Sequence, residues 1–186
     1  VMAHALKELF PQAKLGVGPP VEEGFYYDVE CDTPLTPEDL EKIEKKMAEI
    51  VKADHAFEKE ALPRTKAVEI FKKMGENYKL EIIQKIDPTD EISVYRDGDL
   101  VDLCRGPHIP HTGYIKAVKL LNIAGAYWKG DEKNKQLTRL YGISFRKQKE
   151  LDEYLAMLEE AKKRDHRKLG KELEIFTFDE DVGPGL

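Results

Sequence analysis

The sequence predicts an α+β fold in which antiparallel sheets pack with helices, followed by a long connector helix. Residues 92–95 and 100–103 are apolar runs that flank an Asp-Gly pair, a strong signal for a β-hairpin. Residues 118–128 and 136–145 form a second pair of strand-like runs around a polar turn. Stretches with helical periodicity separate these strands, and strand pairs separated by helices are typical of an α+β domain.

The first quarter of the chain predicts one helix and two strands. Residues 1–10 resemble the last turns of a helix, which Pro11 ends, and we expect the start of this helix to be missing. Residues 14–18 and 24–31 have the β-branched and aromatic content of strands. Glycines and prolines between these two runs predict a turn.

A helix is expected to start at Thr36. Pro37 suits the first helical position, and Asp39 stands where a capping box needs an acceptor. Apolar residues then recur at helical spacing, namely Leu40, Ile43, Met47, Ile50 and Val51.

Three shorter elements and one long helix complete the prediction. Residues 56–62 are a strand candidate, Pro63 opens a helix that ends at Gly75, and residues 77–86 predict a further short helix. A long helix is expected from Lys147 to about Leu173. Its apolar stripe consists of Leu151, Tyr154, Leu155, Leu158 and Ala161, and it becomes strongly basic from Lys162 to Lys171.

The composition indicates a globular protein of a reducing compartment. The chain has 186 residues, of which 41% are hydrophobic and 35% charged. No apolar run approaches the roughly 18 residues of a membrane span, and no signal peptide is visible. Cys31 and Cys104 lie far apart, so a disulfide framework is not expected and a cytoplasmic location is.

Charge is distributed unevenly along the chain. The net charge of −6 argues against a nucleic-acid partner, but residues 115–147 hold 8 basic residues against 2 acidic ones. Tyr127, Trp128, Tyr141 and Phe145 lie among these bases, a pattern compatible with phosphate contacts and base stacking. The alternative is a solvated strand-and-turn surface with its aromatic residues in the core.

The run from Asp102 to His108 is the strongest site candidate. Cys104 and His108 are separated by Arg105-Gly106-Pro107, which no helix interior would accept, so both are expected on a shaped loop. Cys and His serve as metal ligands or as nucleophile and base. Two ligands do not hold zinc, which takes four, or three and a water. The alternative for Cys104 is a small buried apolar side chain.

Other candidates have plain structural explanations when they are taken alone. His4 lies on the first helix, where a histidine is usually core or surface, and Lys79 is one lysine among many. Tyr95 faces the Cys-His loop and suits either the core or a pocket wall. His111 follows Pro110 and is expected at the surface.

Taken together, these motifs resemble the editing domain of the threonyl-tRNA synthetases. The resemblance covers the whole chain and is carried by the motifs at residues 18–28, 102–108, 124–131, 134–135 and 140–142, while residues 164–176 resemble the entry to a class II catalytic domain. It implies three segments. These are an editing domain at 1–146 with a truncated first helix, a linker helix at 147–164, and an incomplete start of the catalytic domain at 165–186.

The resemblance implies hydrolysis of the ester of mischarged seryl-tRNA(Thr) by water. A missing methyl group supplies only about 1–3 kcal/mol of discrimination, so a second, hydrolytic site is physically motivated. The implied catalytic residues are Lys79, Asp102, Cys104 and His108, and the implied substrate contacts are Tyr95, Arg105 and His4. The implied partner is the 3′ acceptor end of tRNA(Thr), with no membrane. We expect a monomer, although the resemblance implies a homodimeric parent enzyme.

Two further functions stay open at this point. The family's HxxxH pair would fall at positions −4 and 0, upstream of Val1, which favours an inactive tRNA acceptor-end binding fragment. A trans-editing protein for alanyl-tRNA is the other alternative, and its family shares the HxxxH and CxxxH motifs. No metal and no cofactor are expected in this chain, because the resemblance places ATP and zinc in the absent catalytic domain. A nucleophilic Cys104 is a minor possibility, since no base is evidently paired with it.

Overall fold

The computed structural model describes residues 1–164 and divides the chain into two compact units. The first unit is Val1–Arg146, and the second begins at Lys147. The first unit contains two antiparallel sheets and four α-helices, so the predicted α+β class is confirmed. The start of the catalytic domain that we predicted at 165–186 lies outside the described residues.

The larger sheet has the strand order β1-β3-β8-β7, with β2 also paired to β3. All of its pairs are antiparallel. The strands are β1 (Lys14–Leu15), β2 (Pro20–Val21), β3 (Gly24–Glu30), β7 (Ala117–Tyr127) and β8 (Gln136–Phe145).

The strand expected at 14–18 is shorter than predicted. It ends at Leu15, although Gly16 and Val17 still exchange backbone hydrogen bonds with Asp28, both 2.8 Å long. Pairing with β3 resumes at β2, where Pro20 lies opposite Phe25.

The smaller sheet has the order β4-β5-β6 and contains the predicted hairpin. Its strands are β4 (Phe57–Leu62), β5 (Ile92–Asp97) and β6 (Leu100–Leu103). Asp97 pairs with Leu100, so Gly98 and Asp99 form the turn, one residue later than the Asp-Gly signal suggests. Gly98 adopts a φ of 60°, which a two-residue hairpin turn requires.

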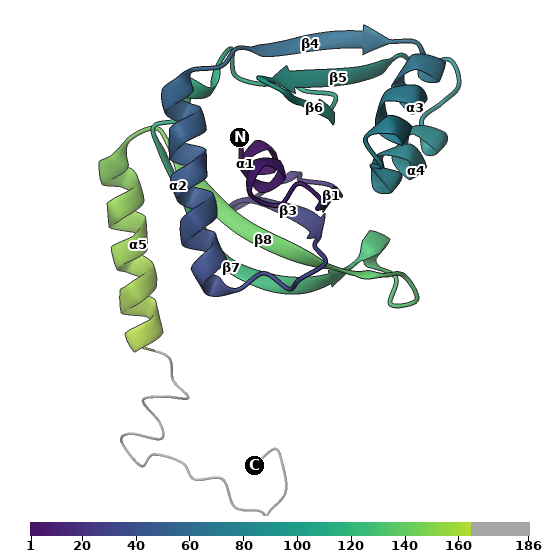
Figure 1. Ribbon diagram of the computed structural model, residues 1–186. Coiled ribbons are helices and arrows are strands. Elements are labelled where there is room, and N and C mark those ends of the chain that lie inside the picture. The colour runs from purple at the N-terminus through teal and green to yellow at the C-terminus, as the bar shows by residue number, and fades with distance from the viewer. Residues whose placement is uncertain (165–186) are drawn as a thin grey trace, which may run out of the picture. The chain divides into compact units, whose positions relative to one another are not determined.

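The helices of the first unit surround and separate the two sheets. In Figure 1, α1 lies between the sheets, and it packs against α2. The α-helices are α1 (Met2–Leu9), α2 (Pro37–Ala53), α3 (Arg64–Lys73) and α4 (Asn77–Lys85), and two 3₁₀ turns lie at Thr112–Tyr114 and Trp128–Gly130. At the start of α2, the Asp39 carboxylate accepts hydrogen bonds from the backbone N–H and the hydroxyl of Thr36, both 2.9 Å long.

Two main apolar cores hold the first unit together. The larger core joins α1 and α2 to the larger sheet, and the predicted residues Leu40, Ile43, Met47 and Ile50 all contribute to it. The smaller core joins α3 and α4 to the smaller sheet around the fully buried Phe71. The space between the sheets is thus bordered by elements that are each fixed by their own core.

Glu76 connects these parts through a buried carboxylate. It is 1% exposed, accepts a 2.8 Å hydrogen bond from the backbone N–H of Leu15, and forms a 2.9 Å ion pair with Lys7. Glu76 precedes α4, whereas Leu15 is in β1 and Lys7 in α1. A single carboxylate therefore sets the position of α4 against the larger sheet.

The second unit contains α5 (Gln148–Lys163) within the described residues. Ion pairs between residues three or four positions apart lie along this helix, including Lys149 with Glu153 and Arg164 with Glu160. The rest of the helix predicted to Leu173 lies outside the described residues. No helix within residues 1–164 has the length and apolar character that crossing a membrane requires.

Glu76→Ala should destabilise the first unit by about 3 kcal/mol, since removal of one partner leaves a lysine and a buried N–H without their acceptor. Urea unfolding measures this. The control is Glu49→Ala, because Glu49 is 67% exposed in its ion pair with Lys46 and should contribute less than about 1 kcal/mol. Equal losses for both variants would contradict the anchoring role of Glu76.

Candidate functional site

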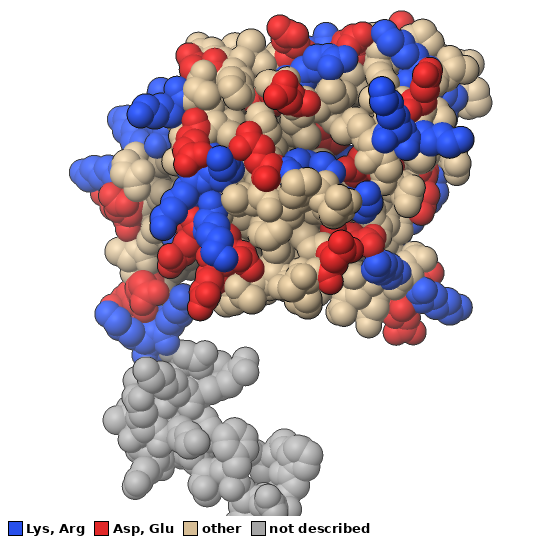
Figure 2. Space-filling model, viewed as in Figure 1, with Lys and Arg blue, Asp and Glu red and all other residues tan. Residues whose placement is uncertain are grey.

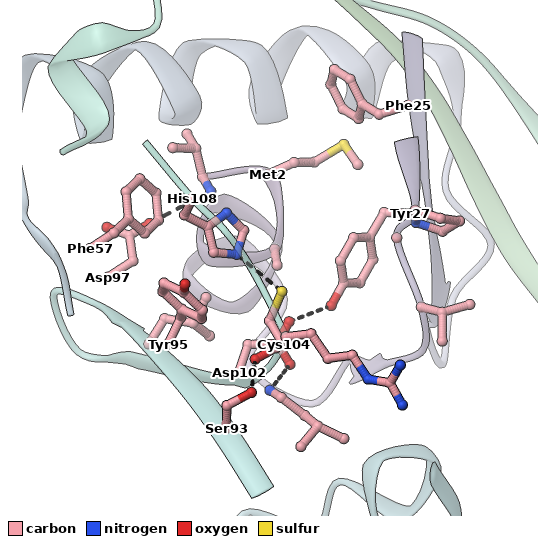
Figure 3. Close-up of a pocket in the computed structure, with 18 of the residues that line it drawn as sticks. Met2, Phe25, Tyr27, Phe57, Ser93, Tyr95, Asp97, Asp102, Cys104 and His108 are labelled. Atoms are coloured by element: carbon pink, nitrogen blue, oxygen red, sulfur yellow. Dashed lines mark hydrogen bonds and ion pairs between the residues drawn. The ribbon is translucent and has the colours of Figure 1, made fainter. Parts of the chain in front are cut away.

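A cleft of about 1150 Å³ opens between the two sheets of the first unit. Its walls come from α1, β3, α4, the smaller sheet and the loop after β6, and Figure 3 shows the side chains that face it. Six of the seven predicted site residues line this cleft, namely Lys79, Tyr95, Asp102, Cys104, Arg105 and His108.

Cys104 and His108 meet on the loop that follows β6. His108 Nε2 lies 3.1 Å from Cys104 Sγ, and the backbone N–H of Gly106 donates to the same sulfur at 3.3 Å. Ser93 holds the start of the loop, since its hydroxyl donates to the Cys104 carbonyl at 2.6 Å and its own carbonyl accepts from the Cys104 N–H at 3.2 Å. Both side chains lie on a loop, as predicted, and His108 contacts the thiol, although the sequence showed no base evidently paired with Cys104.

The shape of this loop depends on Gly106. Its φ is 74°, and a Cβ at this position would lie 2.1 Å from the Tyr95 hydroxyl oxygen. Only glycine permits both the left-handed backbone and the close approach of Tyr95. Tyr95 in turn packs edge-on against His108, with ring centroids 4.3 Å apart, and Phe57 stacks on His108 at 5.3 Å.

This aromatic enclosure affects the protonation of His108. Partial burial lowers the pKa of His108 below its ordinary value, because the two aromatic rings remove some hydration from the charged imidazolium although the residue is still exposed. His108 is therefore neutral near pH 7, and a neutral imidazole has a lone pair that can accept a proton or a hydrogen bond.

The second part of the site is a network around Asp102. Tyr27 donates its hydroxyl to Asp102 Oδ2 at 2.8 Å, and Lys79 Nζ lies 2.6 Å from Oδ1. The backbone N–H of Leu103 also donates to Oδ1, at 2.8 Å. Lys79 further donates to the Tyr27 hydroxyl at 3.2 Å. The network thus joins β3 of the larger sheet, β6 of the smaller sheet and α4.

The network determines what each group can do chemically. Asp102 has accepted three hydrogen bonds, so about one of its roughly four lone-pair positions remains, on Oδ2. Lys79 is 3% exposed and paired as an ammonium, so it can donate but has no lone pair to accept a proton. Burial, followed by the charge of Asp102, raises the pKa of Tyr27, which keeps this hydroxyl a donor.

Tyr27 and Phe57 are cleft residues that the sequence did not reveal to us. Gly18 positions Tyr27, because a Cβ on Gly18 would lie 2.1 Å from Tyr27 Cδ2. The aromatic run on β3 next to Gly18 was the available signal, but nothing local indicated which ring faces Asp102.

His4 is the predicted site residue that lies elsewhere. It is 5% exposed, and its ring nitrogens lie 3.3 Å from Asp97 and 3.2 Å from Glu8 rather than in the cleft. His111, which we expected at the surface, is half-buried and pairs with Asp54.

The basic stretch at residues 115–147 is largely neutralised. Arg139 forms a bidentate pair with Asp28 at 2.6 and 2.8 Å and lies over the Tyr26 ring. Three more of its bases pair with acidic residues from other segments, namely Lys119 with Glu44, Lys129 with Glu81 and Lys135 with Glu30. On the face viewed in Figure 2, basic and acidic side chains are interspersed. These four of the eight bases are thus held in ion pairs, which favours a structural role for them over a phosphate-binding one.

Comparisons with known proteins identify the same region of the chain. Residues 92–141 match the family described as the threonyl and alanyl tRNA synthetase second additional domain. The threonine–tRNA ligases of Citrifermentans bemidjiense, Clostridioides difficile and Nitratidesulfovibrio vulgaris are 59%, 57% and 55% identical to this chain over its 186 residues. The chain spans 29% of the length of each of these relatives.

The matched segment 92–141 contains β5, β6 and the Cys104–His108 loop, so the shared domain includes one wall of the cleft. Over all 186 residues, the chain is similar to the corresponding segment of the threonine–tRNA ligases.

Proposed function

We propose that the first unit is an editing domain that hydrolyses the ester of mischarged seryl-tRNA(Thr). The observation that carries this proposal is the convergence of a neutral imidazole, a buried ammonium and a partly unsatisfied carboxylate in one cleft. The likeness of all 186 residues to a segment of the threonine–tRNA ligases supports threonine-specific tRNA as the partner. A cytoplasmic location and a monomeric state of this chain belong to the same proposal.

Ester hydrolysis requires three functions that these groups can supply. The free lone pair of Asp102 Oδ2 would accept the α-ammonium group of the aminoacyl moiety. The Lys79 ammonium would donate to the ester carbonyl oxygen, which gains negative charge in the transition state. With its Nε2–H donated to Cys104 Sγ, His108 would take a proton from the attacking water on Nδ1.

Arg105 and Lys59 are the basic side chains suited to the tRNA 3′ end. Both line the cleft and are exposed, and neither forms an ion pair with another residue in the range 1–164. We therefore assign phosphate contacts to these residues rather than to the paired bases of β7 and β8.

A thiol mechanism is a second candidate, favoured by the 3.1 Å contact between His108 Nε2 and Cys104 Sγ. In this mechanism His108 accepts the thiol proton, Sγ attacks the carbonyl carbon, and the C–O bond breaks as His108 returns the proton to the departing ribose oxygen. Water then hydrolyses the resulting thioester and releases serine.

Deacylation of seryl-tRNA(Thr) and threonyl-tRNA(Thr) tests the proposal. We expect faster release of serine than of threonine, and Lys79→Gln should reduce the rate by roughly 10²–10³-fold because a transition-state donor is lost. The control is Lys129→Gln, which removes a lysine paired with Glu81 outside the cleft. Salt-dependent tRNA binding without hydrolysis would instead support a binding fragment. Preferential hydrolysis of seryl- or glycyl-tRNA(Ala) would support alanyl-tRNA editing.

Cys104→Ala distinguishes the water and thiol mechanisms. If water attacks, the variant should lose about tenfold in rate, comparable to one hydrogen bond of about 1.4 kcal/mol, and hydroxylamine should trap no acyl-enzyme. A loss on the order of 10⁶-fold together with a trapped acyl-enzyme would establish Cys104 as the nucleophile.

The pH dependence of hydrolysis should report His108. Because burial lowers its pKa, the reactive neutral imidazole persists to lower pH than for an exposed histidine of pKa about 6.5. The rate should therefore fall on the acid side with an apparent pKa below that value, and His108→Gln should abolish this acid limb. An acid limb that persists in His108→Gln would assign the titration to another group. Single-turnover deacylation, corrected for spontaneous ester hydrolysis, provides the measurement.

A further inference from the structure

We propose that His4, His55 and Asp97 form a binding site for a divalent transition-metal ion such as Zn²⁺, separate from the Cys104–His108 loop. One ligand atom from each residue lies within 4.8 Å of the others. His4 comes from α1, His55 from the segment between α2 and β4, and Asp97 from the end of β5. Among residues 1–164 this is the one group of three or more such side chains with ligand atoms this close.

His4 and Asp97 direct two buried atoms without hydrogen-bond partners toward each other. His4 Nε2 lies 3.2 Å from Glu8 Oε1, so this nitrogen carries the proton that faces the carboxylate. In a neutral ring, Nδ1 is then an acceptor, yet it lies 3.3 Å from Asp97 Oδ2, which is also an acceptor. Both atoms are buried and have no hydrogen-bond partner of acceptable geometry. Two lone pairs that converge in a buried space are suited to a cation.

His55 completes the arrangement from the solvent side. Its Nδ1 lies 3.3 Å from Asp97 Oδ1, and its side chain is 33% exposed, which leaves a path for an ion. Ligands about 2.0 Å from a tetrahedral metal lie roughly 3.3 Å from each other. Each imidazole lies at this distance from one oxygen of the same carboxylate, His4 from Oδ2 and His55 from Oδ1. The His55 backbone is fixed by hydrogen bonds with Thr112 of 3.0 and 2.8 Å.

Gly98 provides the space that brings the two imidazoles together. A Cβ on Gly98 would lie 2.9 Å from His55 Nδ1 and 3.2 Å from His4 Cε1. The hairpin turn therefore presents Asp97 and accommodates both rings at one point.

The donor set determines the class of metal. Two imidazole nitrogens and one carboxylate suit Zn²⁺ or Co²⁺, whereas Mg²⁺ and Ca²⁺ prefer all-oxygen sites. Glu8 would act as the carboxylate that orients the metal-bound His4. Three protein ligands leave a fourth position for water.

Calorimetric titration of the metal-free chain with Zn²⁺ tests the proposal, with Co²⁺ absorption spectra as the second measurement. We expect one equivalent of Zn²⁺ to bind, visible bands of tetrahedral Co²⁺, and no binding of Mg²⁺. Cys104→Ala should still bind Zn²⁺, because Cys104 is not one of the proposed ligands. His55→Ala should not bind Zn²⁺, because it removes a ligand. His111→Ala is the matched control, because His111 pairs with Asp54 instead.

A second variant keeps the test decisive if His55→Ala does not fold. Glu8 is 44% exposed, so Glu8→Gln should fold, and loss of its orienting carboxylate should weaken Zn²⁺ binding by roughly 10–100-fold. The proposal is overturned if the unmodified chain binds no Zn²⁺, in which case His4 is a doubly protonated imidazolium between two carboxylates. It is also overturned if Cys104→Ala abolishes binding, or if Glu8→Gln leaves the affinity unchanged.

Discussion

The Asp102 carboxylate is the point on which the architecture of the cleft depends. It lies on β6, yet its partners come from β3 through Tyr27 and from α4 through Lys79. β3 packs in the larger apolar core, whereas β6 and α4 pack in the smaller one. The polar network therefore sets the distance between the two parts at the cleft. Because Lys79 is almost fully buried, its charge requires this carboxylate, and structure and chemistry depend on the same atoms.

The Cys104–His108 loop adds a different kind of control. Gly106 allows Tyr95 to approach the loop, and Tyr95 and Phe57 enclose the His108 ring. This enclosure restrains the imidazole and favours its neutral form. A neutral imidazole and an ammonium held in the same cleft need little rearrangement when charge develops on a bound ester, which is the physical basis of the proposed hydrolysis.

Local signals in the sequence were sufficient for the hairpin, the capped helix at Thr36 and the Cys-His loop, because turn chemistry and capping depend on neighbouring residues. Contacts between distant segments were not predictable in this way. Nothing near Tyr27 or His4 indicates that their partners are Asp102 and Asp97, which are 75 and 93 positions away. The ion pairs of the basic stretch could not be predicted for the same reason. Asp28, the partner of Arg139, lies 111 residues earlier.

A crystal structure with a non-hydrolysable seryl-adenosine, in which an amide replaces the ester, tests the central claim most directly. The account predicts that this ligand occupies the cleft, with its ammonium group on Asp102 Oδ2, its carbonyl oxygen within hydrogen-bond distance of Lys79 Nζ, and its carbonyl carbon accessible to a water held by His108. A ligand bound outside the cleft, or bound with its carbonyl directed away from both Lys79 and His108, would contradict the account.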